Sequence, residues 1–151
     1  MMAAVFDASF LFVAPFWLLM IALPRWRVTR RVIASPWIAA PAAALYLALV
    51  VPGLPGVLGA VSSPSLEAIA PLLGTPEGAT IAWLHFLAFD LFVGRWIYLD
   101  ARERGMTLWV ASPLLFLTLM LGPAGLLGHL LVRGRTGGRG GPSRAGHGGP
   151  R

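Results

Sequence analysis

The hydrophobic positions of the chain gather into four long segments, separated by short polar or proline- and glycine-rich connections. The segments are residues 6–23, 37–51, 80–99 and 108–132. A helix needs about 20 apolar residues to cross a bilayer, so each segment has close to that length, although the second is short without its flanks. The pattern predicts an all-α integral membrane protein, in which residues 1–132 form a bundle of about four transmembrane helices.

The third apolar segment has helix signals at both ends. Thr75 can cap a helix, Pro76 suits its first position, and Glu77 places an acid in its first turn. Gly105 is a natural helix stop. We therefore predict a helix over residues 76–104, which at about 1.5 Å per residue is longer than a hydrocarbon core of about 30 Å.

The connection between the second and third segments, residues 52–78, is broken repeatedly by proline and glycine. Within it, Ser65 can cap a short helix whose Leu66, Ile69 and Leu73 share one face. We interpret this connection as an interfacial or re-entrant stretch rather than a further span.

Charged residues make up 12% of the chain, whereas a soluble domain carries about 25%. The net charge of +6 comes from 12 arginines without a lysine, and all of these except Arg95 lie in the connections and the tail. This arrangement indicates membrane orientation and contact with lipid headgroups rather than nucleic acid. The absence of cysteine excludes disulfides, thiolate metal sites and cysteine nucleophiles.

The arginines pose a question of topology. With four spans, the arginines of residues 25–31 share a membrane side with residues 100–104, where Asp100 and Arg104 can pair. The arginine- and glycine-rich tail, residues 133–151, then lies on the opposite side, against the positive-inside rule. A fifth span in residues 52–78 would remove the conflict, but the composition of that stretch favours four. For the tail we predict disorder.

Asp90 lies in the middle of the third segment, where a charged side chain costs roughly 2.5–3.5 kcal/mol on insertion scales. Such a residue faces the protein interior, finds a partner, or stays protonated. At 100° per residue, one helix face carries Trp83, Leu87, Asp90, Gly94, Ile97 and Ala101. Gly94 would let another helix approach closely. Asp90 is therefore either a functional acid or a structural hydrogen-bonding group, with Tyr46 and Thr118 as candidate partners.

His85 precedes Asp90 by five residues, which places the two about 140° apart around the helix. This spacing argues against a dyad formed by these two residues alone. His85 instead shares a stripe with Phe89, Phe92 and Trp96, which is typical of packing or lipid contact. A histidine in such a stripe can also line a groove for a flat, apolar ligand.

A second polar set depends on how the helices are arranged. In an antiparallel four-helix bundle, His85, His129, Asp7 and Glu77 would lie near one membrane face and could hold a metal ion. Nothing in the sequence fixes their spacing, and we predict neither a metal site nor a cofactor. Phosphate-loop, dinucleotide-binding and nucleophile-elbow motifs are absent from the sequence.

Three stretches together resemble the abscisic-acid-deficient-four-like family of small membrane proteins. They are PFWLLMIALPRW, WLHFLAFDLFVGRWIYLDARERG and LTLMLGPAGLLGHL. The resemblance covers about residues 6–131 and leaves the tail outside. It implies four spans and, from the plant members needed for neoxanthin synthesis, conversion of an epoxy-carotenoid to an allenic one.

Within that resemblance, Asp90 and His85 match the family motif and are the candidate catalytic residues. The candidate ligand-binding residues are Trp83, Phe89, Gly94, Trp96 and Tyr46. An acid would protonate the epoxide oxygen while a base removes a vinylic proton.

We therefore expect a multi-pass protein of a bacterial cytoplasmic membrane that contacts lipid and acts on a carotenoid or other isoprenoid by isomerisation. The alternative is a non-catalytic subunit or assembly factor, homo-oligomeric or with a membrane partner, in which Asp90 is a helix-packing contact. Transfer of a proton or small solute through Asp90 is weaker, because a single acid makes a poor pathway. We expect no nucleic-acid partner.

Overall fold

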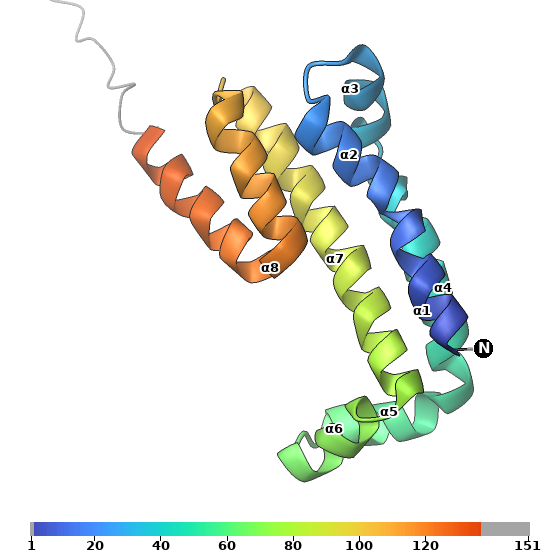
Figure 1. The fold of residues 1–151 in the computed structure, drawn as a ribbon. Coiled ribbons are helices and arrows are strands. Elements are labelled where there is room, and N and C mark those ends of the chain that lie inside the picture. Colours follow the sequence, from blue (N-terminus) through green and yellow to red (C-terminus); the bar gives the residue numbers. More distant parts are fainter. Residues whose placement is uncertain (1, 137–151) are drawn as a thin grey trace, which may run out of the picture.

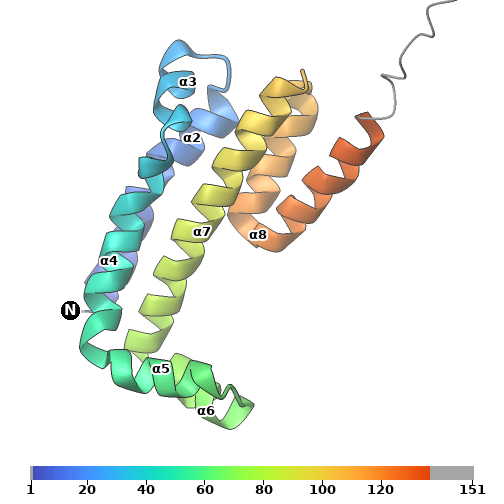
Figure 2. The same ribbon diagram turned by 180° about the vertical axis from the view of Figure 1, so that it is seen from behind.

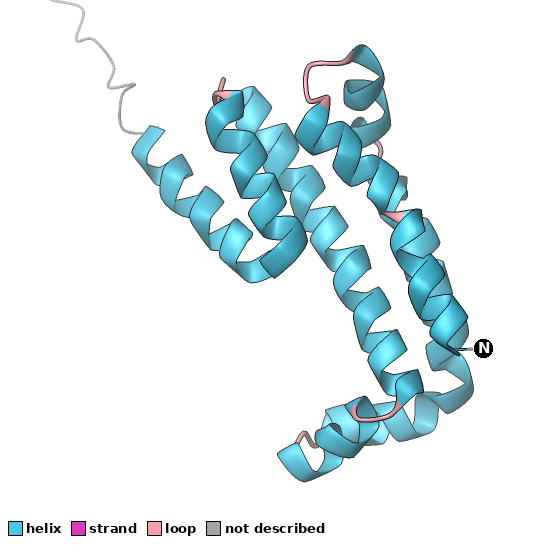
Figure 3. Ribbon diagram, in the orientation of Figure 1, coloured by secondary structure: helices cyan, strands magenta, loops and turns pink. Residues whose placement is uncertain are grey.

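The computed structural model describes residues 2–136, and this part of the chain is helical apart from short connections (Figure 3). The elements in order are α1 (Met2–Ser9), η1 (Phe10–Phe12), α2 (Ala14–Ala22), α3 (Arg27–Ala34), η2 (Pro36–Ala39), α4 (Ala40–Val50), η3 (Val51–Gly53), α5 (Leu54–Ser62), α6 (Leu66–Leu73), α7 (Pro76–Glu103) and α8 (Leu108–Thr136). Of the predicted tail, residues 133–136 continue α8, and residues 137–151 lie outside the described residues.

Four helical stretches are long and apolar enough to cross a membrane, which confirms the predicted fold class. They are Met2–Ala22, Pro36–Ser62, Pro76–Glu103 and Leu108–Gly134. The last helix of the second stretch, α5, does not continue its direction. Together with α6 it lies across the end of the molecule where α7 begins (Figures 1 and 2).

The predicted helix signals around α7 are present in the structure. The Thr75 hydroxyl accepts a hydrogen bond of 3.0 Å from the Gly78 amide, and Pro76 opens the helix. At the other end, Gly105 has a φ of 63°, a left-handed conformation that glycine adopts without steric cost. Ser65 caps α6 as expected, accepting a bond of 3.2 Å from the Ala68 amide.

The predicted interior face of α7 is the face that packs against the other helices. Leu87, Ile97 and Ala101 are buried, and Asp90 is partly buried. Gly94 is covered by the indole of Trp17 from α2, and a Cβ at this position would lie 2.7 Å from Cζ3 of that ring. The close approach predicted at a glycine in this face therefore exists, with an aromatic side chain as the partner.

Hydrogen bonds from α7 hold the arginine-bearing turn between α2 and α3 at the C-terminal end of α7. The Tyr98 hydroxyl donates to the carbonyl of Pro24 at 2.8 Å. Arg95 donates to the carbonyls of Ile33 at 2.9 Å and Ala34 at 2.6 Å, near the last turn of α3. A cation is favourable there because the terminal carbonyls of a helix lack partners within the helix.

The helix α8 is not a straight rod but two arms joined at Leu121, whose φ of −143° and ψ of 61° are not helical. Pro123 explains the position of the break, because it lacks an amide hydrogen and its ring clashes with the carbonyl four residues earlier. We call residues 108–120 the first arm and residues 122–136 the second arm. Figure 1 shows the first arm running back along α7 and the second arm turning towards the end from which the first came.

Candidate functional site

Two aspartates of α7 face α8, and each meets a different part of the broken helix. Asp90 contacts the break itself, whereas Asp100 contacts the second arm. The two positions lie about 15 Å apart along the helix axis, at a rise of about 1.5 Å per residue. One contact therefore falls in the middle of α7 and the other near its C-terminal end.

The carboxylate of Asp90 rests against Gly122, the first residue of the second arm. A Cβ added at Gly122 would meet Oδ1 of Asp90 and would lie 2.8 Å from its Cγ. Only a residue without a side chain allows the carboxylate to approach the backbone this closely. The first turn of a helix also carries unpaired amides and partial positive charge, so the start of the second arm is a favourable place for an acid.

The predicted hydrogen-bond partners of Asp90 are wrong. The Thr118 hydroxyl donates to the carbonyl of Leu114 at 2.8 Å, within its own helix, and the Tyr46 ring lies beside His85. Among the described residues, no hydrogen bond reaches the Asp90 carboxylate. Asp90 is thus a partly buried acid in an apolar part of the helix, held by packing on a glycine.

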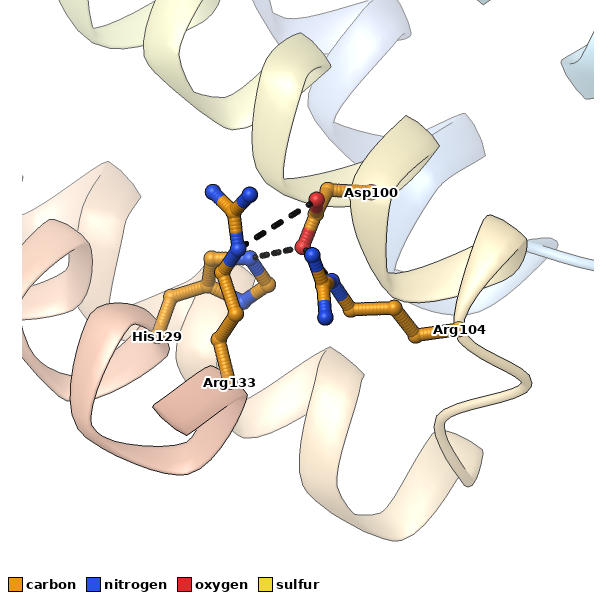
Figure 4. Close-up of polar contacts among 4 residues, drawn as sticks. All are labelled: Asp100, Arg104, His129 and Arg133. Carbon is orange, nitrogen blue, oxygen red and sulfur yellow. Dashed lines mark hydrogen bonds and ion pairs between the residues drawn. The ribbon is translucent and has the colours of Figure 1, made fainter. Parts of the chain in front are cut away.

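Asp100 belongs to a polar cluster with Arg104, His129 and Arg133, which we call the Asp100 cluster (Figure 4). Oδ2 of Asp100 lies 2.9 Å from Nε2 of His129 and 2.9 Å from Nε of Arg104, and Oδ1 lies 3.7 Å from Nε of Arg133. The His129 side chain is 0% exposed and that of Asp100 is 11% exposed. A single acid is surrounded by groups that can supply positive charge, and the cluster ties the second arm to α7.

The His129 ring is fixed on two sides. Its Nε2 faces the Asp100 carboxylate, so the proton belongs on that nitrogen. Nδ1 is buried and has no hydrogen-bond partner among the described residues. The Trp96 ring meets the imidazole edge-on, with centroids 5.2 Å apart, and Arg133 lies 5.5 Å from the centre of the Trp96 ring. Trp96, predicted to bind ligand, is therefore part of the packing around the Asp100 cluster.

Sequence reasoning identified the Asp100–Arg104 pair, which the structure confirms, but missed the contact with His129. That contact depends on the fold-back of α8, which returns His129 to the level of Asp100. The expected gathering of His85, His129, Asp7 and Glu77 near one membrane face is wrong. The fold-back places His129 beside Asp100, and Glu77 lies about 35 Å from Asp100 along α7. Within residues 2–136, no group of three or more histidine or acidic side chains could hold a metal ion.

His85 is exposed and lies in an aromatic group in the N-terminal half of α7. Its ring stacks on Phe89 with centroids 4.6 Å apart, and the Tyr46 ring meets it edge-on at 5.7 Å. Beside this group lies a pocket of about 290 Å³. Its lining is apolar except for Tyr46 and His85, and comprises Tyr46, Val50, Val57, Val61, Ile69, Leu72, Leu73, Gly78, Ile81, Ala82, His85 and Phe86.

The residues predicted to bind ligand or to catalyse therefore do not form one site. His85, Tyr46 and Phe89 lie together, and Phe89 is 61% exposed. Trp83 packs against Phe6 of α1, with ring centroids 5.4 Å apart. Gly94 is buried under an indole, away from this group. In agreement with the predicted spacing, no hydrogen bond joins His85 to Asp90 within the described residues.

These features define a helical integral membrane protein with an intramembrane acid packed on a broken helix. The family model described as ABA DEFICIENT 4-like matches residues 4–129, and the chain belongs to this family. The chain is also 28% identical over 138 residues to Protein ABA DEFICIENT 4, chloroplastic, of Arabidopsis thaliana. That match covers 87% of this chain and 61% of the plant protein, so the chain spans about three fifths of the length of this relative. No solved structure matches the chain.

Proposed function

We propose that the protein acts within the membrane on a carotenoid or another long isoprenoid, by an acid–base isomerisation in which Asp90 is the proton donor. The observation that carries the proposal is the setting of Asp90: a carboxyl group in the middle of α7, without a hydrogen bond to any described residue. Intramembrane acids are costly and mark functional sites. Membership of the ABA DEFICIENT 4-like family, with its plant relatives in neoxanthin synthesis, supports an isoprenoid substrate.

The proposed step is an isomerisation and needs no further reactant. The protonated carboxyl group of Asp90 gives its proton to an epoxide oxygen as the carbon–oxygen bond opens. A base takes a proton from the neighbouring vinylic carbon, and the electron pair of that carbon–hydrogen bond forms the second double bond of the allene. The product has the atoms of the substrate, and the two protein groups exchange protonation states.

His85 is the candidate base. It lies five residues before Asp90, about 7.5 Å along the helix axis, so the two groups act on different atoms of an elongated ligand. The stacked Phe89 ring and the apolar pocket beside His85 provide a surface for a flat, apolar molecule. We place the protein in a bacterial cytoplasmic membrane, in contact with lipid and either as a homo-oligomer or with a membrane partner.

The second candidate function is that of a non-catalytic membrane subunit or assembly factor. The contact between Asp90 and Gly122 favours it, because a carboxylate that fills a gap at a helix break can serve packing alone. The two functions differ in what Asp90→Asn does, since the amide has nearly the same shape as the acid but cannot donate the same proton.

The test is expression of the wild type and Asp90→Asn in a bacterial host that makes epoxy-carotenoids, with protein level and extracted pigments measured together. Glu67→Gln is the matched control, because Glu67 is exposed on α6. We expect the wild type and the control to change the pigment profile, and Asp90→Asn to accumulate normally without doing so.

Other outcomes would overturn parts of the proposal. An unchanged pigment profile with the wild type would remove epoxy-carotenoids as substrates. A pigment change that survives Asp90→Asn would remove Asp90 as the acid. Failure of only the Asp90→Asn protein to accumulate would favour the packing function.

A further inference from the structure

We propose that α8 enters and leaves the membrane on the same side. The chain then crosses the membrane three times and turns one arginine-bearing surface towards the anionic phospholipid headgroups of the cytoplasmic leaflet. This inference concerns topology and a lipid-facing surface, and it holds whether or not the protein is an enzyme.

The first support is the fold-back of the second arm onto the first. A Cβ at Gly125 would lie 2.5 Å from Cα of Thr118, and a Cβ at Gly128 would lie 2.9 Å from Cδ2 of Leu114. In a straight helix, residues seven and fourteen apart are separated by about 10 Å and about 21 Å along the axis, so these contacts require the arms to lie side by side. Glycines at 125 and 128 allow this approach, as small residues do between helices in membranes.

The second support is the position of the end of α8. His129 and Arg133 contact Asp100, which lies in the last turn of α7 before the connection that leads into α8. The second arm has therefore returned to the level at which the first arm began. Figure 1 shows the end of α8, the end of α7 and α3 at the same end of the molecule, opposite α5 and α6.

The third support is the length of each arm. Residues 108–120 and 122–136 form arms of about 20 Å each, which is too short for a hydrocarbon core of about 30 Å. By contrast, α7 is about 42 Å long and crosses it easily. The sequence of α8 is long and apolar enough for a span, but the two arms form a re-entrant hairpin that enters and leaves on the same side of the membrane.

The start of the second arm, just after the break, is covered by α7, since Gly122 is buried. Non-helical backbone at membrane depth is tolerated where protein covers it. Asp90 covers Gly122 at this point, and the Asp100 cluster holds the second arm against α7. Both contacts come from α7, the longest spanning helix of the described chain.

The arginines then fall on one side. Within residues 2–134, the arginines lie in the α2–α3 turn, in α3, in the last part of α7 and in the second arm. They are Arg25, Arg27, Arg30, Arg31, Arg95, Arg102, Arg104 and Arg133. The opposite end, formed by α5, α6 and the start of α7, carries Glu67 and Glu77 and no arginine. Three crossings therefore agree with the positive-inside rule, which four crossings violate.

The partner of this surface is anionic phospholipid. Arg25, Arg27, Arg30 and Arg31 are exposed in and before α3, the short helix at that end. Basic residues next to a membrane are attracted by the negative potential of the cytoplasmic leaflet. No acidic residue lies within residues 24–36, so these arginines have no acidic neighbour along that stretch.

The chain contains no cysteine, so single cysteines report their own accessibility. The experiment places one each by Ser63→Cys between α5 and α6, Thr107→Cys between α7 and α8, and Gly134→Cys in the second arm. All three positions are exposed. Each full-length variant is treated with a membrane-impermeant maleimide, in intact cells without an outer membrane and in inside-out vesicles. The unsubstituted chain is the control for background.

We expect Ser63→Cys to react in intact cells, and Thr107→Cys and Gly134→Cys to react only in inside-out vesicles. Reaction of Gly134→Cys together with Ser63→Cys would show that α8 crosses the membrane and would overturn the proposal. Reaction of Thr107→Cys and Gly134→Cys in intact cells would overturn the cytoplasmic assignment. If Gly134→Cys does not accumulate, a reporter protein fused after residue 136, active in one compartment only, decides the same question.

Discussion

Asp90 and Asp100 lie on the same helix and both face α8, yet their surroundings differ in almost every respect. Asp100 has a buried histidine and two arginines within 4 Å, and it lies at the arginine-bearing end of the molecule. Asp90 touches a glycine at a helix break and accepts no hydrogen bond from any described residue. Both acids help to position α8, one by charge and the other by shape.

The difference separates a structural acid from a candidate chemical one. A carboxylate surrounded by cations is stabilised in its charged form and resists giving or taking a proton. An acid without such partners in an apolar setting stays available for proton transfer. If this interpretation is correct, substitutions at Asp100 and its partners should act on stability, and a conservative substitution at Asp90 should act on function.

The largest loss of stability is expected for His129→Ala. The change removes the buried partner of the Asp100 carboxylate and leaves a space beside Trp96. Hydrogen bonds to charged groups contribute about 1.5–3 kcal/mol, so we expect a loss of about 2–3 kcal/mol. Thermal unfolding in detergent measures it. The control is His85→Ala, which removes an exposed ring and should change the free energy of unfolding by about 0.5 kcal/mol or less. Equal losses of stability in the two variants would contradict the role of His129 in holding the second arm on α7.

Gly122→Ala tests the contact at the break. The new Cβ would meet the Asp90 carboxylate, and overpacking of this kind costs about 1–3 kcal/mol. Gly53→Ala is the control, because a Cβ there would meet nothing within 4 Å. The loss should shrink when Asp90→Ala is added, giving a coupling of about 0.5–3 kcal/mol in a double-mutant cycle. Additive losses would show that the two residues do not touch.

The comparison is sharpest with the same substitution at both acids. Asp100→Asn weakens the contacts with His129, Arg104 and Arg133, and we expect a loss of about 1–2 kcal/mol. Asp90→Asn removes no hydrogen bond within the described chain and should stay within about 0.5 kcal/mol of the wild type. The measurement compares the unfolding midpoints of the two variants with that of the wild type in the same detergent. A larger loss for Asp90→Asn would reverse the assignment of the two roles.

The smallest effect is expected for Arg104→Gln. Arg104 and Asp100 are four residues apart on α7, and the arginine side chain is 30% exposed. Such pairs contribute about 0.3–0.5 kcal/mol, and salt screens them. The loss should therefore fall further when unfolding is measured at high ionic strength. A loss as large as that of His129→Ala would mean that Arg104 is a principal partner of Asp100.

Much of α7 could be predicted from the sequence because its determinants are local. The cap at Thr75, the stop at Gly105 and the pairing of Asp100 with Arg104 depend on residues within a turn or two of each other. The interior face carrying Leu87, Asp90 and Gly94 follows from a period of 3.6 residues. The partners of that face did not follow, because packing brings them from distant parts of the chain.

By itself, the sequence determined the class of the protein, its apolar stretches, the ends of α7 and the acid in its middle. Only the tertiary structure decided what that acid touches, that His129 lies against Asp100, and that the arginines within residues 2–134 lie at one end of the molecule. The physical reason is the break at Leu121. The φ and ψ angles of this one residue change the direction of the fifteen residues that follow, but they change neither the hydropathy nor the length of the segment from which a span is predicted. Composition measures how well a segment suits lipid, but the direction in which it leaves the membrane depends on what it packs against.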